Sequence, residues 1–451
     1  MSSTATLDPS AASTLFALDP LWLSTSILIC SYGLLLSDRV NRTVVALIGA
    51  ALVIVTGVIS QSEAFAGIDF NTIALLTGMM IIVSITRVSG IFEYVAIWSA
   101  KKVKADPLSI LIVLSIVTAV FSAFLDNLTS VLLVVPIALL ITEKLQVSPY
   151  PFLYSQIMAA NIGGAATLIG DPPNVLIGSA SGLTFTQFLI ELGPVSVLIL
   201  LVLLPLCKWL WGSQMVASAE RRDSIMRFNE TNSITDRGLV IKSLGTLSLV
   251  IIGFIIGEHH GIRPGTTAMF GAAVLLGLTM IGENTEEQSK RVHQAFQDVE
   301  WDALFFFMGL FVIVAGVNHA GLLEILGAKL VAFTGGDPAR TAYATLWLSA
   351  IISMAVDNIP FVATMIPLVQ SMEAGLGGAT AAEPVWWALA LGACLGGNGS
   401  LIGAAANVMV ASLGERSGHP IRFSQYIKIG LPVMLISVAV AHAYLYLKHF
   451  H

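Results

Sequence analysis

Long apolar runs, interrupted by short polar stretches, make up most of the chain. Runs of about 16 or more apolar residues recur from about residue 20 to residue 447, and a helix needs about 20 such residues to cross a bilayer. The strongest interruptions inside these runs are Asp126-Asn127 and Asp357-Asn358. A carboxylate at the centre of a membrane costs roughly 2.5–3.5 kcal/mol on insertion scales. Two Asp-Asn pairs in such positions therefore indicate a function.

The composition agrees with a polytopic, all-α membrane protein. The 451 residues are 56% hydrophobic and 11% charged, with a mean hydropathy of +0.85, whereas soluble domains contain about 25% charged residues. The first 20 residues contain no Lys or Arg, so no signal peptide is predicted. The three cysteines are isolated, which predicts neither a disulfide framework nor a metal site. We expect no cofactor, no nucleic-acid partner and no enzymatic activity, because no nucleophile–base pattern is present.

The two halves of the chain repeat one pattern. At an offset of 231 residues, Asp126-Asn127 aligns with Asp357-Asn358, and glycines, glutamates and Asp-Pro pairs align in the same order. At an offset of 233, "GGAATLIGDPPNVLIGS" (163–179) aligns with "GGNGSLIGAAANVMVAS" (396–412), with eight identities in 17 positions. A duplicated unit follows. The predicted parts are an amino-terminal tail (1–20), membrane repeat 1 (21–211), a linker (212–238) and membrane repeat 2 (239–447).

The distribution of Lys and Arg predicts the orientation in the cell (inner) membrane. It places the linker in the cytoplasm and both termini outside. The apolar arms on either side of each Asp-Asn pair either cross the membrane or form a re-entrant hairpin with its tip at mid-depth, and charge does not separate the two. With hairpins, each repeat has five spans, so the repeats are inverted. We expect about 10 transmembrane helices, two re-entrant hairpins and two broken helices.

Two glycine-rich segments predict the broken helices. "NIGGAATLIGDPPN" (161–174) contains three glycines and two adjacent prolines, which a continuous helix does not accommodate. Its counterpart, "LGGNGSLIGAAAN" (395–407), contains four glycines. The free ends of broken helices carry partial charges that bind small ions. The alternative is glycine-mediated packing between helices.

Amide, hydroxyl and backbone groups at the hairpin tips and helix breaks are the expected substrate ligands. An amide both donates and accepts hydrogen bonds, so it can bind a neutral hydroxide or a cation. The expected ligands are Asn127, Thr129, Ser130, Gly163, Gly164, Thr167, Asn174, Asn358, Gly396, Gly397, Asn398, Ser400 and Asn407.

Three carboxylates are the candidates for coupling to protons. Asp126 and Asp357 are the first two, because burial moves the ionisation of a carboxyl group toward neutral pH. The alternative is that each caps a hairpin arm, and both roles can hold together. Asp171 is the third, and it has no acidic counterpart because Ala404 takes its place in repeat 2. Ordinary turn formation before Pro172-Pro173 is an equal alternative for Asp171.

Four motifs carry a resemblance to a known superfamily. "FLDNLTSVLLVVP", "NIGGAATLIGDPPNV", "DNIPFVATMIP" and "GACLGGNGSLIGAAANV" resemble the ion transporter superfamily, in its arsenite permease (ArsB), P-protein and NhaD-like branch with a citrate-transporter-like domain. The resemblance implies a homodimer and an elevator-like movement of the hairpin domain. Related dicarboxylate carriers have Ser-Asn-Thr at the hairpin tips, whereas this chain has Asp-Asn, which weakens a sodium–dicarboxylate interpretation.

These observations predict a secondary active transporter. The first expectation is a proton-coupled antiporter that exports arsenite or antimonite, because the predicted site lacks the Arg or Lys expected for citrate. The alternatives are a sodium/proton antiporter, then a carrier or channel for organic or inorganic anions. The expected partners are a small inorganic solute, a proton or sodium as coupling ion, the lipid bilayer and a second copy of the chain. A cytoplasmic ATPase subunit is not excluded.

Overall fold

The computed structural model describes residues 18–37 and 39–451, so most of the predicted amino-terminal tail lies outside it. The described residues form helices, turns and loops without a β-strand, which confirms the predicted all-α fold. Repeat 1 contains α1 (Pro20–Ser37), α2 (Arg42–Val55), α3 (Gln61–Ala66), α4 (Phe70–Val88), α5 (Ile91–Lys102), α6 (Pro107–Phe124), α7 (Asn127–Leu145), α8 (Tyr150–Gly164), α9 (Pro172–Ser181) and α10 (Phe185–Trp211).

Repeat 2 has the same number of α-helices in the same order. They are α12 (Arg237–His259), α13 (Pro264–Met280), α14 (Thr285–Gln297), α15 (Trp301–His319), α16 (Leu322–Thr334), α17 (Pro338–Ala355), α18 (Asn358–Met372), α19 (Ala379–Gly396), α20 (Ala405–Arg416) and α21 (Phe423–His449). The linker between the repeats contains α11 (Ala219–Met226) and short 3₁₀ turns.

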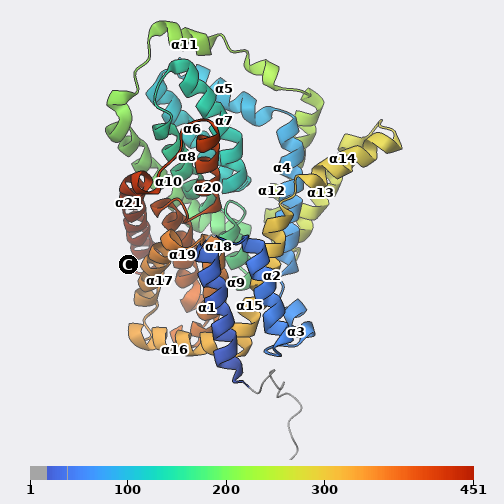
Figure 1. Cartoon of the computed structure of the whole chain (residues 1–451), viewed down its shortest axis with the longest axis vertical. Coiled ribbons are helices and arrows are strands. Elements are labelled where there is room, and N and C mark those ends of the chain that lie inside the picture. The colour runs from blue at the N-terminus through green and yellow to red at the C-terminus, as the bar shows by residue number, and fades with distance from the viewer. Residues whose placement is uncertain (1–17, 38) are drawn as a thin grey trace, which may run out of the picture.

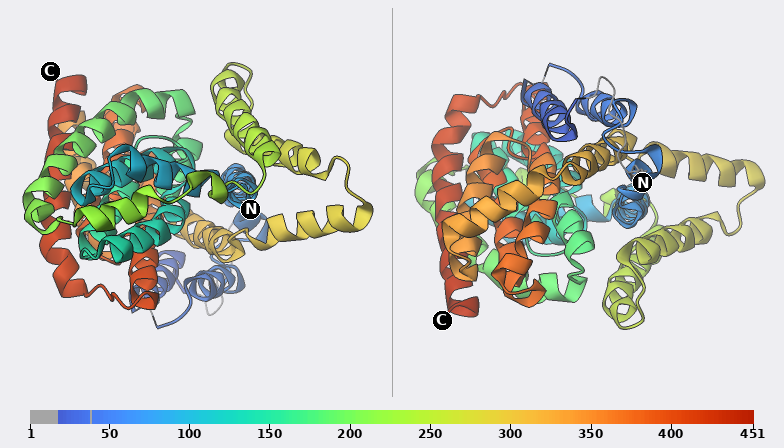
Figure 2. Two further views of the ribbon diagram at one scale, coloured as in Figure 1. Left: turned by 90° about the horizontal axis from the view of Figure 1, so that it is seen from above. Right: turned by 90° about the horizontal axis from the view of Figure 1, so that it is seen from below.

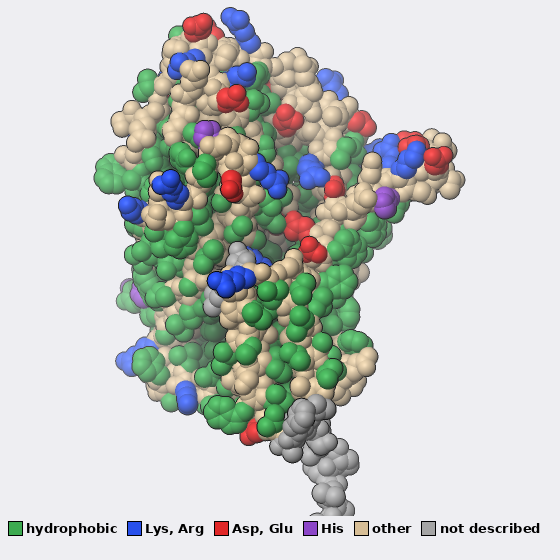
Figure 3. All heavy atoms as spheres, in the orientation of Figure 1, with side chains coloured by type: hydrophobic (Ala, Val, Ile, Leu, Met, Phe, Trp, Pro, Cys, Tyr) green, Lys and Arg blue, Asp and Glu red, His purple; other side chains and the backbone are tan. Residues whose placement is uncertain are grey.

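The helices are long and apolar enough for a polytopic membrane protein. Within the described residues, seven helices of 18 or more residues have the length and composition to cross a membrane, and three shorter apolar helices accompany them. On the face shown in Figure 3, hydrophobic side chains cover most of the lower half, while most charged side chains lie in the upper half and on α14. The number of helices agrees with the predicted architecture.

The two hairpins enter the molecule from opposite ends. In Figure 1 the α6–α7 hairpin occupies the upper half, under the linker, and the α17–α18 hairpin occupies the lower half. The first described residues and the end of α21 lie toward the lower end, away from the linker. Seen from above and below, α12, α13 and α14 form an arm beside the main body (Figure 2). This is the arrangement expected of inverted repeats with re-entrant hairpins.

The aligned Asp-Pro pairs mark equivalent helix starts. Asp106 accepts a hydrogen bond from the Ser109 backbone and caps α6, with Pro107 in the first turn. Asp337 caps α17 in the same way, followed by Pro338. Proline is tolerated in the first turn because its missing N–H has no helical partner there. The same local sequence therefore begins the first arm of each hairpin.

The repeats are interlocked through exchanged helix pairs. Helix α4 of repeat 1 packs against α13 of repeat 2, and α15 of repeat 2 packs against α2 of repeat 1. A Cβ added to Gly78 would lie 2.6 Å from the Ala268 carbonyl carbon, and one on Gly309 would lie 2.7 Å from that of Ala46. These glycines, aligned at the offset of 231, allow the backbones of the two repeats to approach closely.

Within each repeat, the first hairpin arm packs against the broken helix. Helix α6 contacts α8, and α17 contacts α19. A Cβ on Gly163 would lie 2.1 Å from the Ala119 carbonyl oxygen, and one on Gly396 would lie 2.6 Å from that of Ala350. Gly163 and Gly396 were both expected as ligands. They make close contacts between helices, as the alternative interpretation of glycine-mediated packing predicts.

Candidate functional site

The first hairpin tip is built by a capping aspartate. Asp126 precedes α7, and its carboxylate accepts hydrogen bonds from the Thr129 backbone N–H (2.6 Å) and the Thr129 hydroxyl (2.7 Å). The Ser130 hydroxyl donates to the Asp126 carbonyl. The capping role proposed as an alternative for Asp126 is therefore present, and the Thr129 and Ser130 hydroxyls are used within the tip itself.

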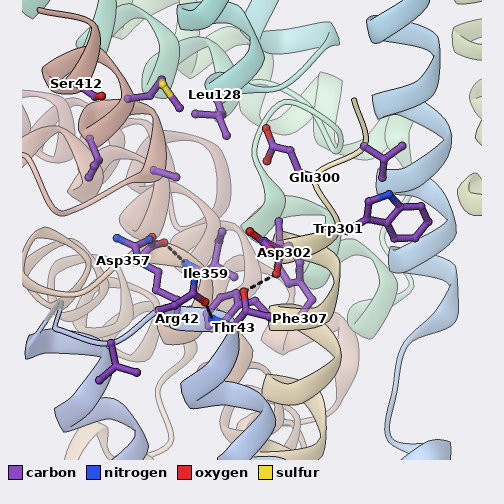
Figure 4. Close-up of a pocket in the computed structure, with 18 of the residues that line it drawn as sticks. Arg42, Thr43, Leu128, Glu300, Trp301, Asp302, Phe307, Asp357, Ile359 and Ser412 are labelled. Carbon is purple, nitrogen blue, oxygen red and sulfur yellow. Dashed lines mark hydrogen bonds and ion pairs between the residues drawn. The ribbon is translucent and has the colours of Figure 1, made fainter. Parts of the chain in front are cut away.

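The second hairpin tip has the same cap and an additional charge partner. Asp357 precedes α18 and accepts from the Ile359 backbone N–H at 3.2 Å. Its carboxylate also forms an ion pair with Arg42 at the start of α2, drawn in Figure 4. None of the ion pairs among the described residues involves Asp126. The two tip carboxylates therefore differ in their electrostatic surroundings.

The closing asparagines of the broken helices satisfy backbone carbonyls that the breaks leave free. The Asn174 amide donates to the Gly164, Ala165 and Thr167 carbonyls at 2.9–3.4 Å. The Asn407 amide donates to the Gly397 and Ser400 carbonyls at 2.6 and 2.8 Å. Both side chains are fully buried. Since a buried carbonyl without a partner is costly, the two asparagines stabilise the breaks.

Two hydroxyls attach the breaks to the hairpins. The Thr167 hydroxyl donates to the Ala123 carbonyl near the end of α6. The Ser400 hydroxyl donates to the Met354 carbonyl near the end of α17, at 2.5 Å. The contacts are equivalent under the repeat. Thr167 and Ser400 thus hold each broken segment against its own hairpin.

The broken helices meet each other at the centre, where Asn161 and Cys394, which the sequence analysis did not single out, contact predicted site residues. Asn161, on α8, donates to the side-chain oxygens of Asn398 and Asn407, both at 3.0 Å. Its own side-chain oxygen accepts from Asn127 at 3.5 Å. The residue at the equivalent place on α19 is Cys394, whose thiol donates to Asn174 at 3.5 Å. One amide and one thiol therefore connect the two broken helices at this point.

Asp171 lies on the other side of this centre. It caps no helix and accepts hydrogen bonds from the Asn358 side chain at 3.2 and 3.3 Å. Asp171 is 1% exposed, so its carboxyl group is buried and is held by the Asn358 amide. This arrangement suits a group that changes protonation during a cycle.

Two neighbouring spaces lead to these residues. The central cavity, of about 90 Å³, lies between the two tips and is lined by, among others, Asp126, Asn127, Asp171, Glu300, Asn358 and Ile359. The vestibule, of about 860 Å³, is open and is lined by, among others, Arg39, Arg42, Leu128, Glu300, Asp302, Asp357 and Ser412. Figure 4 shows the vestibule between α15 and α20, with the Arg42–Asp357 ion pair on one side. Four of the predicted site residues line the central cavity: Asp126, Asn127, Asp171 and Asn358.

The missed residues had no aligned signal in the sequence. Arg42 and Glu300 stand next to apolar runs and belong to none of the four motifs. Asn161 and Cys394 occupy equivalent positions at the offset of 233, but the residue types differ. Both residues lie inside the four quoted motifs, but neither was singled out. Comparing chemically different residues at equivalent positions near the breaks could have revealed this pair.

The family is shown by comparison with known proteins. The family model described as citrate transporter (CitMHS) matches residues 32–392. The chain belongs to the citrate transporter family. An uncharacterized transporter of Mycobacterium tuberculosis is 42% identical over 432 residues, covering 95% of this chain and 98% of that protein. The human P protein is 32% identical over 511 residues, covering 95% of this chain and 60% of that protein. The P-protein part of the expected resemblance is therefore confirmed.

Solved structures of membrane transporters share the fold of this family member. The YdaH transporter of Alcanivorax borkumensis has a TM-score of 0.64 at 14% identity, covering 95% of this chain and 98% of that one. MtrF of Neisseria gonorrhoeae has a TM-score of 0.54 at 11% identity, covering 97% and 96%. The family and its curated relatives, together with this fold, show a membrane transporter, with amides and carboxylates where its two repeats meet.

Proposed function

We propose that the chain is a secondary active transporter that exports arsenite or antimonite in exchange for protons. The main support is the chemistry of the central cavity. It is small, and its lining combines the amides of Asn127 and Asn358 with the carboxylates of Asp126, Asp171 and Glu300. Arsenite is a small, mostly uncharged trihydroxide at neutral pH. Its hydroxyls can donate to these oxygens and accept from the amides.

The same lining argues against citrate as the substrate, although the family is described as citrate transporter. Among the described residues that line the central cavity there is no Lys, Arg or His. A tricarboxylate would face three carboxylates without a compensating cation, and recognition of carboxylates by proteins usually relies on Arg or Lys. Arg42 is close by, but its charge is already paired with Asp357.

A sodium/proton antiporter is the second candidate, and the three carboxylates of the cavity favour it. Within the described part of the chain, however, no three acidic, His or Cys residues are grouped closely enough to hold a metal ion. Sodium would have to be bound mainly by amide and backbone oxygens. We therefore place the neutral hydroxide first and sodium second.

Parallel flux measurements in everted vesicles test the proposal. Arsenite, antimonite, sodium and citrate are offered separately, and the internal pH is recorded. We expect saturable uptake of arsenite and antimonite that consumes an imposed pH gradient. Sodium uptake with proton release would favour the second candidate, and citrate uptake alone would reject both. The proposed location is the cell membrane, with the linker in the cytoplasm and a homodimer as the working unit.

A further inference from the structure

The carboxylate of Glu300 neither caps a helix nor takes part in the hydrogen-bond network of the site. It precedes α15, and its side chain caps nothing. Its counterpart at the offset of 231 is Asp69, which caps α4 by accepting from the Asn71 and Thr72 backbones and from the Thr72 hydroxyl. Within the described residues, no hydrogen bond or ion pair engages the Glu300 carboxylate. The change from Asp69 to Glu300 between the repeats thus leaves one carboxylate free.

The position of Glu300 connects the two spaces of the site. Of these two spaces, Asp126 and Asp171 line the central cavity but not the vestibule, and Asp302 and Asp357 line the vestibule but not the central cavity. Glu300 is the acidic residue, among those described, that lines both. Figure 4 shows its side chain projecting into the space beside Leu128. A proton that moves from the vestibule to the central cavity through side chains therefore has Glu300 as its connecting group.

We propose that Glu300 is the proton-entry residue of the transporter. A proton from water in the vestibule binds the Glu300 carboxylate and neutralises it. The acid then releases that proton to the carboxylate of Asp126 or Asp171, directly or through one water, and Glu300 becomes an anion again. Charge and atoms balance in both steps, and no other reactant is needed. This inference rests on the proposed proton coupling, which it deepens by naming the entry point.

The charges around Glu300 agree with this role. Asp126 and Asp171 face it from the central cavity, and Asp302 faces it from the vestibule. The cations of the vestibule are Arg39 and Arg42, the latter paired with Asp357. Burial, and then the Asp126 charge, raise the pKa of Glu300 to about 7. Since a raised pKa means that the proton is held below about pH 7 and released above it, Glu300 exchanges protons in the working range.

The test compares Glu300→Gln with Glu300→Asp and with Asp302→Asn, all in the full-length protein in proteoliposomes. Asp302 is the matched control because it is an acid two residues away that lines only the vestibule. Two rates are measured for arsenite and for sodium: uptake driven by a pH gradient, and exchange at equal pH. For Glu300→Gln we expect gradient-driven uptake to fall at least about tenfold, while exchange is kept. Glu300→Asp should restore part of the driven uptake. Asp302→Asn should change neither rate strongly, because Asn is the residue that repeat 1 has at the equivalent position, Asn71.

Infrared spectroscopy of the purified protein separates this inference from the proposed function. We expect a protonated-carboxyl band that titrates near pH 7, is lost in Glu300→Gln and persists in Asp302→Asn. If Glu300→Gln keeps gradient-driven uptake with its pH profile unchanged, the inference is wrong even if arsenite is the substrate. If the wild type exchanges no tested solute for protons, the proposed function fails. In that case, absence of the Glu300 band overturns the inference too, and its presence supports the assignment of Glu300 as a proton-exchanging group.

Discussion

The two repeats make equivalent contacts in most places. At one place, a contact that is formed in repeat 1 is absent from repeat 2. In repeat 1 the Asn71 amide, on α4, donates to the Ser179 hydroxyl on α9 at 3.2 Å. The equivalent residues of repeat 2 are Asp302 on α15 and Ser412 on α20, at the offsets of 231 and 233. These two residues line opposite sides of the open vestibule, as Figure 4 shows. The Asn71–Ser179 pair is therefore in contact, whereas the vestibule separates Asp302 from Ser412.

We infer that this difference between equivalent pairs has a conformational origin. Both ends of each pair are polar and could bond in either repeat, so residue type does not explain why one pair is apart. In inverted-repeat transporters the repeats exchange arrangements when access alternates from one side to the other. The structure therefore has the arrangement that is open on the side of Arg42 and closed on the side of Asn71.

Other differences between the repeats are differences of residue type, and no motion removes them. Asp171 stands opposite Ala404, Glu300 opposite Asp69, and Asn161 opposite Cys394. Asp171 and Glu300 are carboxylates of the site that cap no helix. The other repeat has Ala404 in place of Asp171 and a capping acid, Asp69, in place of Glu300. The comparison thus separates a difference in contacts from differences in residue type.

The largest expected effect comes from fixing the closed pair. In a background without Cys30, Asn71→Cys with Ser179→Cys should react with a short bifunctional thiol reagent and lose essentially all transport. The reason is that alternating access requires this pair to separate. Transport before and after the reagent is the measurement, with each single cysteine as control. The pair Asp302→Cys with Ser412→Cys should be linked only when solute and gradient favour the opposite state. Full activity of the linked Asn71–Ser179 protein would contradict the alternation.

Loss of the tip amides should be the next largest effect. Asn127→Ala and Asn358→Ala should each lower transport by about 10- to 100-fold, because a lost hydrogen bond with a buried partner costs about 1–3 kcal/mol. The protein should remain folded, as size-exclusion chromatography would show. Asn232→Ala, in the exposed linker, is the matched control. Normal flux in both tip variants would move the binding site elsewhere.

Neutralising the tip acids should remove coupling without removing binding. Asp126→Asn and Asp357→Asn keep the shape of the side chain but cannot take up a proton. We expect solute exchange at equal pH to persist and accumulation against a gradient to be lost. Asp171→Asn, measured in parallel, tests the unpaired acid of the comparison. If only Asp171→Asn uncouples, the coupling carboxylate is the one that repeat 2 lacks.

The smallest expected effects concern packing. Gly163→Ala and Gly396→Ala should each lower the free energy of unfolding by about 1–3 kcal/mol, because the added methyl meets backbone atoms. The loss should be larger for Gly163, whose added Cβ would lie 2.1 Å from a carbonyl oxygen, compared with 2.6 Å for Gly396. Thermal unfolding in detergent is the measurement. Gly277→Ala, with no atom within 4 Å, is the control and should not destabilise.

The duplicated architecture could be predicted because it repeats in the sequence. The Asp-Asn tips, the Asp-Pro helix starts and the two helix breaks all align, and each alignment marks a backbone feature. The directions of side chains could not be predicted in this way. Thr129, Thr167 and Ser400 are polar groups near the site, yet their hydroxyls face the tip or a hairpin carbonyl. The sequence identifies a polar residue but does not say which neighbour satisfies it.

The residues that join the repeats were the hardest to predict. Arg42 reaches Asp357 across 315 positions of sequence, and Asn161 reaches Asn398 across 237. These partners come together only because the repeats are inverted and interlocked. Glu300 was missed for a different reason. Its carboxylate is available because it does not cap α15, whereas its counterpart Asp69 caps α4. A pattern of aligned residues cannot reveal a missing contact.

The packing of helices between the repeats also determines the order in which the nascent chain can assemble. Gly78 of α4 packs on Ala268 of α13, so α4 leaves the ribosome about 190 residues before its partner exists. At synthesis rates of about 5–20 residues per second, this wait lasts roughly 10–40 seconds. During that time the closely packing face of α4 has only lipid, or an insertion factor, to cover it. Final assembly of repeat 1 therefore depends on the translation of repeat 2.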